Sequence, residues 1–86
     1  MVVVRLNKED EIYVYYLISR NLKRIRKAKG MTQEQLAEAS TYSVGFIMNI
    51  ESKKYIQTVS IGTLWQFAKV LDCDIREFFN PDVEEL

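Results

Sequence analysis

The sequence has no histidine and a single cysteine, and these shortages exclude several kinds of functional site. Zinc fingers of the Cys/His type and imidazole-based catalysis both require histidine. Cys73 has no second cysteine with which to form an internal disulfide. The carboxylates and lysines show no paired spacing that indicates acid–base catalysis. The sequence therefore predicts that the chain is not an enzyme and that it carries no metal and no cofactor.

Long apolar segments are missing as well. The chain contains no run of about 18 or more apolar residues, so no transmembrane helix and no membrane partner are expected. Its first residues, MVVVR, lack the basic start and the long apolar stretch of a signal peptide, so the cytoplasm is the expected location. The 86 residues suffice for one domain with a small core and leave little room for an active-site cleft.

The net charge is zero, but the charges are divided unevenly along the chain. Residues 1–29 hold eight basic and three acidic side chains, residues 30–54 hold two and three, and residues 55–86 hold two and six. A basic first half is compatible with binding to nucleic-acid phosphates, and solvated helix surface is an equally open interpretation. The cationic residues expected on the first long helix are Arg20, Lys23, Arg24, Arg26, Lys27 and Lys29.

Two helix-start signals lie eleven residues apart, at Thr32 and Ser43. Thr32 and Gln35 have the spacing of a capping box, so a helix is expected to begin near Gln33. The hydroxyl-rich run 40–43 should end that helix, because its side chains compete for backbone hydrogen bonds. Ser43 should then cap a second short helix. Two short helices that meet at a tight corner are typical of proteins that read DNA.

Each of the two short helices has a face suited to packing. In the first, the small and apolar side chains of Leu36, Ala37 and Ser40 should point inward. In the second, Ile47 and Ile50 form the expected buried stripe. The positions left for a partner to touch are Val44, Gly45, Met48 and Asn49.

The flanking segments also predict helices. Residues 8–29 can form one long helix, with the acidic residues 9–11 at its N-terminus and Gly30 as its C-cap. Ser60 should cap another helix, with Trp65 at the edge of its apolar face. The members of that face are Leu64, Phe67, Ala68 and Leu71.

The two ends of the chain carry further predictions. Asp74 and Glu77 have the spacing of another capping box, for a last short helix that Pro81 stops. The β-prone residues 1–7 are expected to be an arm, or an edge strand that pairs with a second copy. The tyrosine-rich segment 12–17 either packs over the C-terminal helices or forms part of a dimer interface, where tyrosine is enriched.

Four segments, in this order, resemble the Cro/repressor-like (XRE-like) helix-turn-helix family of bacterial and phage transcription regulators: LKRIRKAKGMTQEQLA at 22–37, IMNIE at 47–51, TLWQFAKVL at 63–71 and IREF at 75–78. The resemblance implies an all-α fold, a compact five-helix lambda-repressor-like DNA-binding domain. An extended first helix and a short N-terminal arm or edge strand would be added to it. Residues 1–17 would be the arm and helix extension, with a dimerising role left open, 18–79 the helix-turn-helix domain and 80–86 an acidic tail.

The resemblance also implies which residues meet DNA. Gln33 would clamp a phosphate at the start of the second helix, and the two lysines that follow the third helix would lie against phosphates. Family members read base edges with polar side chains at the start of the third helix, whereas this chain offers Val44 and Phe46, which can contact only a thymine methyl. Asn49 alone is suited to bidentate recognition of adenine, so base reading should be sparse and A·T-leaning. The full predicted set is Thr32, Gln33, Ser43, Val44, Gly45, Phe46, Asn49, Lys53, Lys54 and Tyr55.

One further pair is implied by the resemblance alone. Arg26 and Glu51 match an arginine and a glutamate that form a partly buried ion pair between the first and third helices of the family. Their expected role is structural, because breaking a well-buried pair costs on the order of 3–5 kcal/mol.

Two functions remain open from the sequence. The first is a sequence-specific DNA-binding transcriptional regulator, expected to be a repressor, that docks as a homodimer on double-stranded DNA through the major groove. The second is a protein-interaction module on the same scaffold, such as an antitoxin or a partner-binding regulator. In that case the apolar residues Val44, Phe46, Met48 and Tyr55 would form the patch that meets the partner protein.

Overall fold

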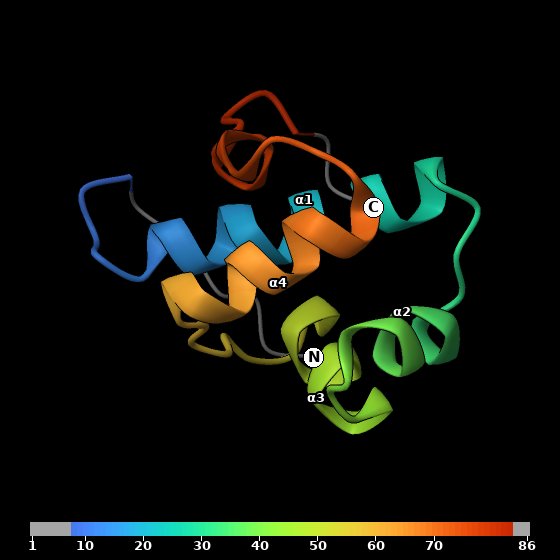
Figure 1. Ribbon diagram of the computed structural model, residues 1–86. Helices are drawn as coiled ribbons and strands as arrows, with labels where there is room; N and C mark the ends of the chain where they lie inside the picture. The colour runs from blue at the N-terminus through green and yellow to red at the C-terminus, as the bar shows by residue number, and fades with distance from the viewer. Residues whose placement is uncertain (1–7, 84–86) are drawn as a thin grey trace.

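The computed structural model describes residues 8–83, which form four α-helices and one 3-10 helix. The helices are α1 (Tyr13–Ala28), α2 (Gln33–Ser40), α3 (Val44–Glu51) and α4 (Ile61–Leu71), and the 3-10 helix is η1 (Ile75–Phe79). In the view of Figure 1, α4 passes in front of α1, the α2–α3 pair lies below them and η1 lies above. Contacts join α1 to α3 and η1, and α4 to α2 and η1.

A single apolar core receives side chains from every one of these helices. The predicted inward residues of α2, α3 and α4 are all buried, which confirms those three faces. Burial of a large apolar side chain stabilises a fold by about 1.5–3 kcal/mol, so this core is the main source of stability. Its most enclosed apolar members are Leu22, Leu36, Ile47, Ile50, Leu64, Phe67, Leu71 and Phe78.

Trp65 departs from the predicted arrangement of α4. Its side chain is 55% exposed, so it lies on the solvent side and not at the edge of the core. The neighbouring position, Leu64, is fully buried, and successive helix positions are separated by about 100° around the axis. The prediction that Trp65 lies at the edge of the apolar face was therefore wrong.

The first helix is shorter than the sequence predicted. It begins at Tyr13, and residues 8–12 form exposed turns that end with the Tyr13 amide donating to the carbonyl of Asp10. Helical turns in proteins depend mainly on tertiary packing, and none of residues 8–12 buries a side chain. The charges at positions 8–11 are thus insufficient to extend α1.

The C-terminal end of α1 follows the prediction. Gly30 adopts a positive φ of 71°, and its amide donates to the carbonyl of Lys27 at 2.9 Å. The amide of Met31 donates to the carbonyl of Arg26 at 3.1 Å. These two bonds form a Schellman motif, whose left-handed residue is most easily a glycine.

The predicted N-caps of α2, α3 and α4 are all present. The Thr32 hydroxyl accepts from the amide of Gln35 at 3.0 Å, and the Gln35 side chain accepts from the amide of Thr32 at 2.8 Å. The hydroxyls of Ser43 and Ser60 each accept from the amide three residues later, at 3.1 Å. Each cap satisfies donors that a helix leaves unpaired at its start.

The capping box predicted for the last helix is absent. Asp74 accepts from the amide and guanidinium of Arg76, and this partner lowers the pKa of the Asp74 carboxyl to about 2. Glu77 instead pairs with Arg24 of α1, at 3.2 Å. Because α1 attracts the glutamate side chain, it does not return to the backbone of residue 74.

The tyrosine-rich start of α1 packs partly against the molecule itself. Tyr15 is half-buried against the core, and the rings of Tyr13 and Tyr16 lie 5.8 Å apart. A role for this segment in dimerisation stays a prediction. No strand occurs within residues 8–83, and the predicted N-terminal arm lies outside the described residues. None of the helices in this part of the chain has the length and apolarity needed to cross a membrane.

Candidate nucleic-acid interface

The corner between α2 and α3 is made by three residues, 41–43. Thr41 ends α2 in the left-handed region, with φ 64°, and Ser43 then begins α3. The Ser40 hydroxyl donates to the carbonyl of Leu36 at 2.7 Å, so it is satisfied within its own helix. The left-handed residue at position 41 and the cap at Ser43 turn the chain from α2 into α3.

The inner side of α3 is held by a buried ion pair. Arg26 Nε and Nη2 donate to Glu51 Oε2 and Oε1, each at 2.8 Å, so the pair is bidentate. Arg26 Nη1 also donates to the carbonyl of Met31 at 2.7 Å. The bond to Glu51 raises the pKa of Arg26, which keeps its charge fixed. The pair therefore joins α1 to the last residue of α3.

Gln33, the predicted phosphate clamp, belongs to the same network. Its side-chain nitrogen donates to Glu51 Oε1 at 3.2 Å, and the residue is half-buried. One amide hydrogen is used in this way, and the other, with the amide oxygen, is available for a ligand. Gln33 is thus oriented by Glu51 at the N-terminus of α2.

Arg20 corrects the expectation of a solvated cation. The residue is only 1% exposed, and its guanidinium donates to the backbone carbonyl of Glu51 and to the hydroxyl of Ser19. A cation at the C-terminus of a helix is favoured, because the last carbonyls are unpaired and carry partial negative charge. The apolar pattern of α1 gave no signal for this role, since a charged residue is almost never fully buried unless it is paired.

The outer side of α3 is mostly apolar. Met48 is 52% exposed, and Val44, Gly45 and Asn49 are exposed as well. Asn49 is the one side chain on this side of α3 that can form hydrogen bonds. Direct reading of bases by this helix can therefore involve few polar contacts.

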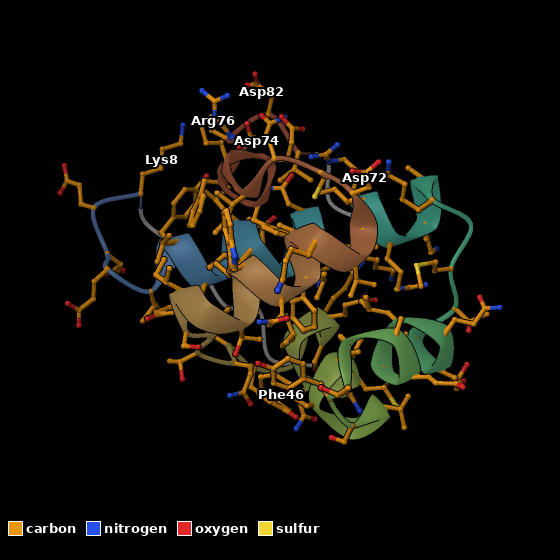
Figure 2. All side chains as sticks on the ribbon, in the orientation of Figure 1. Lys8, Phe46, Asp72, Asp74, Arg76 and Asp82 are labelled. Atoms are coloured by element: carbon orange, nitrogen blue, oxygen red, sulfur yellow. The ribbon has the colours of Figure 1, made fainter. Side chains whose placement is uncertain are left out.

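Phe46, at the first turn of α3, is tied to the core. Its ring lies 5.4 Å from Tyr42, which in turn lies 5.4 Å from Phe67. The Tyr42 hydroxyl shares a hydrogen bond with Thr63 at 3.0 Å. Figure 2 shows Phe46 at the end of the molecule opposite to Asp74 and Arg76. Because this ring is half-buried, only part of it can meet a partner.

The segment after α3 carries Lys53, Lys54 and Tyr55, all exposed. For two further cations, Lys23 and Lys27 on α1, the sequence did not decide between solvated surface and phosphate binding. Burial lowers the pKa of Lys23, and the positive charges of Lys27, Arg20 and Lys53 lower it further. Lys23 therefore lies near both Lys27 of its own helix and Lys53 of the segment after α3. Their approach depends on the packing of α1 against α3, which no sequence pattern displays.

The comparisons with known proteins agree with this architecture. The helix-turn-helix family model HTH_3 matches residues 22–78, which is more than half of the chain. The chain belongs to this family. Its members are transcription regulators and not enzymes, and the family fold is the lambda-repressor-like one that the resemblance implied.

Three solved structures share the fold. The restriction-modification controller protein C.AhdI from Aeromonas hydrophila is 29% identical, with a TM-score of 0.68 over 76% of this chain and 96% of that one. An HTH_3 family transcriptional regulator from Vibrio cholerae is 26% identical, with a TM-score of 0.75, over 85% of this chain but only 40% of that one. The hypothetical transcription factor NHTF from Neisseria, at 18% identity, has a TM-score of 0.73 over 95% and 92%. A comparison with curated proteins gives no match.

Proposed function

We propose that the chain is a sequence-specific DNA-binding transcriptional regulator, acting as a repressor in the cytoplasm of a bacterial host. A homodimer would place one α3 in each of two major-groove half-sites, about one helical turn apart on an inverted repeat. The observation that carries the proposal is the placement of α3: its inner side is fixed by buried bonds to Arg20 and Arg26, and its outer side is exposed.

The charges near α3 support the same function. The charges of Lys27 and Lys53 both act on Lys23, so α1 and the segment after α3 bring basic side chains near one another although the chain is neutral overall. Lysines next to a groove-binding helix bind phosphates and supply affinity that does not depend on sequence. The controller protein C.AhdI, of which 96% is covered, is a regulator on the same scaffold.

Specificity would come from few direct contacts. On the outer side of α3, the side chain of Asn49 alone is able to pair with a base in two places. Val44 can meet a thymine methyl, and the remaining selectivity would depend on the shape and bending of the DNA. We therefore expect a short, palindromic and A·T-rich recognition sequence.

Selection from a random duplex pool tests this proposal most directly. The full chain should enrich an inverted repeat. Its affinity for random duplex should fall steeply between low and moderate salt, because binding releases cations from the DNA and this release is less favourable at higher salt. Failure to recover a palindromic motif would contradict sequence-specific regulation. Light scattering at the binding concentration should give the mass of a dimer, and a monomer that still binds the full repeat would contradict the homodimer.

A second candidate is a protein-interaction module, which the exposed apolar residues Val44 and Met48 favour. A partner protein, such as the toxin of an antitoxin pair, would then cover the outer side of α3. This function predicts no salt-sensitive binding to duplex DNA. The salt titration described above separates the two candidates, because association through apolar surface is insensitive to moderate salt.

A further inference from the structure

Tyr55 lies in the segment after α3, and its hydroxyl donates a hydrogen bond to Oδ1 of Asn49. We propose that Tyr55 is a positioning residue for base reading, which holds the amide of Asn49 so that its N–H donors face the DNA. The inference rests on the proposed function, since it assigns to Tyr55 a role in how α3 selects a base. It differs from direct contact of Tyr55 with DNA.

The local fold brings Tyr55 back to α3. After the helix ends, the amide of Ser52 donates to the carbonyl of Asn49 at 3.2 Å. The Ser52 hydroxyl then accepts from the amide of Lys54 at 3.0 Å, which closes a serine turn. The chain reverses direction within these residues. Tyr55 therefore returns to the side chain at position 49, although the two residues are six positions apart.

The chemistry of the two groups decides which end of the amide faces outward. A phenol hydroxyl is a better donor than acceptor, because its lone pairs are delocalised into the ring, so it pairs with the amide oxygen. That bond uses one of the two lone pairs of Oδ1 and leaves Nδ2 with both of its hydrogens. Within residues 8–83 no acceptor takes either hydrogen of Asn49 Nδ2.

Such an amide is matched to a base edge that offers acceptors. In the major groove a purine presents the N7 acceptor together with a second polar group, thymine presents only the O4 acceptor, and cytosine presents a donor. An exposed asparagine without a partner would have to lose rotamer freedom when it binds, and prior fixation by Tyr55 reduces that cost. We therefore expect a purine on the strand whose base Asn49 contacts.

Tyr55 is suited to act through Asn49. The residue is 47% exposed, so its ring is half-covered, and its hydroxyl hydrogen is already used in the bond to Oδ1. Removal of the hydroxyl alone, by Tyr55→Phe, keeps the ring and its packing. The variant therefore separates positioning of the amide from structural support of the segment.

The test is selection from a random duplex pool, followed by competition at single base pairs, with the full chain and three variants. These are Tyr55→Phe, Asn49→Ala and the double variant. Tyr55→Phe should lower the purine preference about three- to tenfold at the same base pair that Asn49→Ala relaxes, the value of one hydrogen bond. Tyr55→Phe should change the ratio between matched and mismatched sites more than it changes the affinity for random duplex. The double variant should be no less selective than Asn49→Ala, and the control Tyr13→Phe should keep the full motif.

Three results would overturn the inference. A Tyr55→Phe protein with the unchanged motif would show that the hydroxyl does not act on base selection. A further loss in the double variant, beyond Asn49→Ala, would show that Tyr55 meets DNA by itself. An equal loss of affinity for all sequences would assign Tyr55 a structural role. If the parent chain selects no motif, the proposed function fails and this inference with it, whereas a parent motif that Tyr55→Phe preserves rejects only this inference.

Discussion

The buried side of α3 carries ionic and hydrogen bonds from two other helices, whereas its outward side carries one hydrogen-bonding side chain. The bonds on the buried side come from α1 and from the start of α2, and they all end on one residue, Glu51. The outward side presents Val44, Gly45, Met48 and Asn49. Several polar contacts therefore position α3, whereas in the proposed function few polar side chains would read the bases.

This difference separates two properties that a DNA-binding helix needs. Precise placement requires that the backbone of α3 does not move, and Glu51 provides it by accepting from Arg26 and Gln33 through its side chain and from Arg20 through its carbonyl. Selectivity requires groups that match a base edge, and in the proposed function it depends on Asn49. Substitutions on the two sides should consequently change different measured quantities.

The largest effect is expected for Glu51→Ala. The variant leaves Arg26 buried without its partner, which should lower the free energy of unfolding by about 3–5 kcal/mol. Urea or thermal denaturation measures this loss. The control Glu38→Ala removes an exposed carboxylate from α2 and should change stability by no more than about 0.5 kcal/mol. Similar small losses in both variants would show that the buried pair does not anchor α3.

Asn49→Ala should have the next largest effect, and it should change base preference and not folding stability. Its folding stability should stay near that of the parent chain, while preference at one base pair should fall by about 1–3 kcal/mol. Competition binding with single-base substitutions measures the preference. The control Gln66→Ala removes an exposed amide from α4 and should not change it. A folded Asn49→Ala protein with the parent motif would mean that the outward side of α3 is not the reading surface.

The corner before α3 should affect stability alone. The left-handed conformation costs a branched residue such as Thr41 about 1–2 kcal/mol, and Thr41→Gly removes this cost. The same substitution increases the entropy of the unfolded chain, which opposes part of the gain. We expect a net gain of about 0.5–1 kcal/mol in thermal unfolding, with the selected motif unchanged. Gly30→Ala, where φ is 71°, is the reverse substitution and should lose a similar amount. A destabilised Thr41→Gly protein would show that the bond from the Thr41 hydroxyl to the Ser40 carbonyl outweighs the strain.

Lys54→Ala should have the smallest effect, and this effect should be the same for every DNA sequence. The loss of one phosphate contact should weaken binding to every sequence equally and reduce the slope of log affinity against log salt by about one. Lys8→Ala makes the same change of charge at the end of the molecule opposite to Phe46 (Figure 2), so its slope should match the parent. A change in base preference with Lys54→Ala would place this lysine among the base-reading residues.

Most of the fold could be predicted because its signals are local. The Thr32–Gln35 capping box, the caps at Ser43 and Ser60 and the Schellman motif at Gly30 each involve residues within a few positions of one another. Their geometry follows from backbone groups that any helix leaves unpaired at its ends. The apolar stripes of α3 and α4 follow in the same way from helical periodicity.

Two of the incorrect predictions share a different cause. Asp74 and Glu77 have the spacing of a capping box, but Arg24 of α1 pairs with the glutamate. Arg20 looks like a surface cation in the sequence, but the end of α3 lies against it and accepts its hydrogen bond. In both cases a residue distant in sequence competes for the side chain, and no local pattern contains that competitor.

The sequence by itself determined where the helices of the helix-turn-helix begin and end, because caps, glycine and apolar spacing act within one or two turns. Only the tertiary structure decided what surrounds α3. It placed Arg20 beneath the end of the helix, Lys23 within the field of Lys53, and the Tyr55 hydroxyl on Asn49. These groups meet because the core packs α1 against α3 and a serine turn reverses the chain after it.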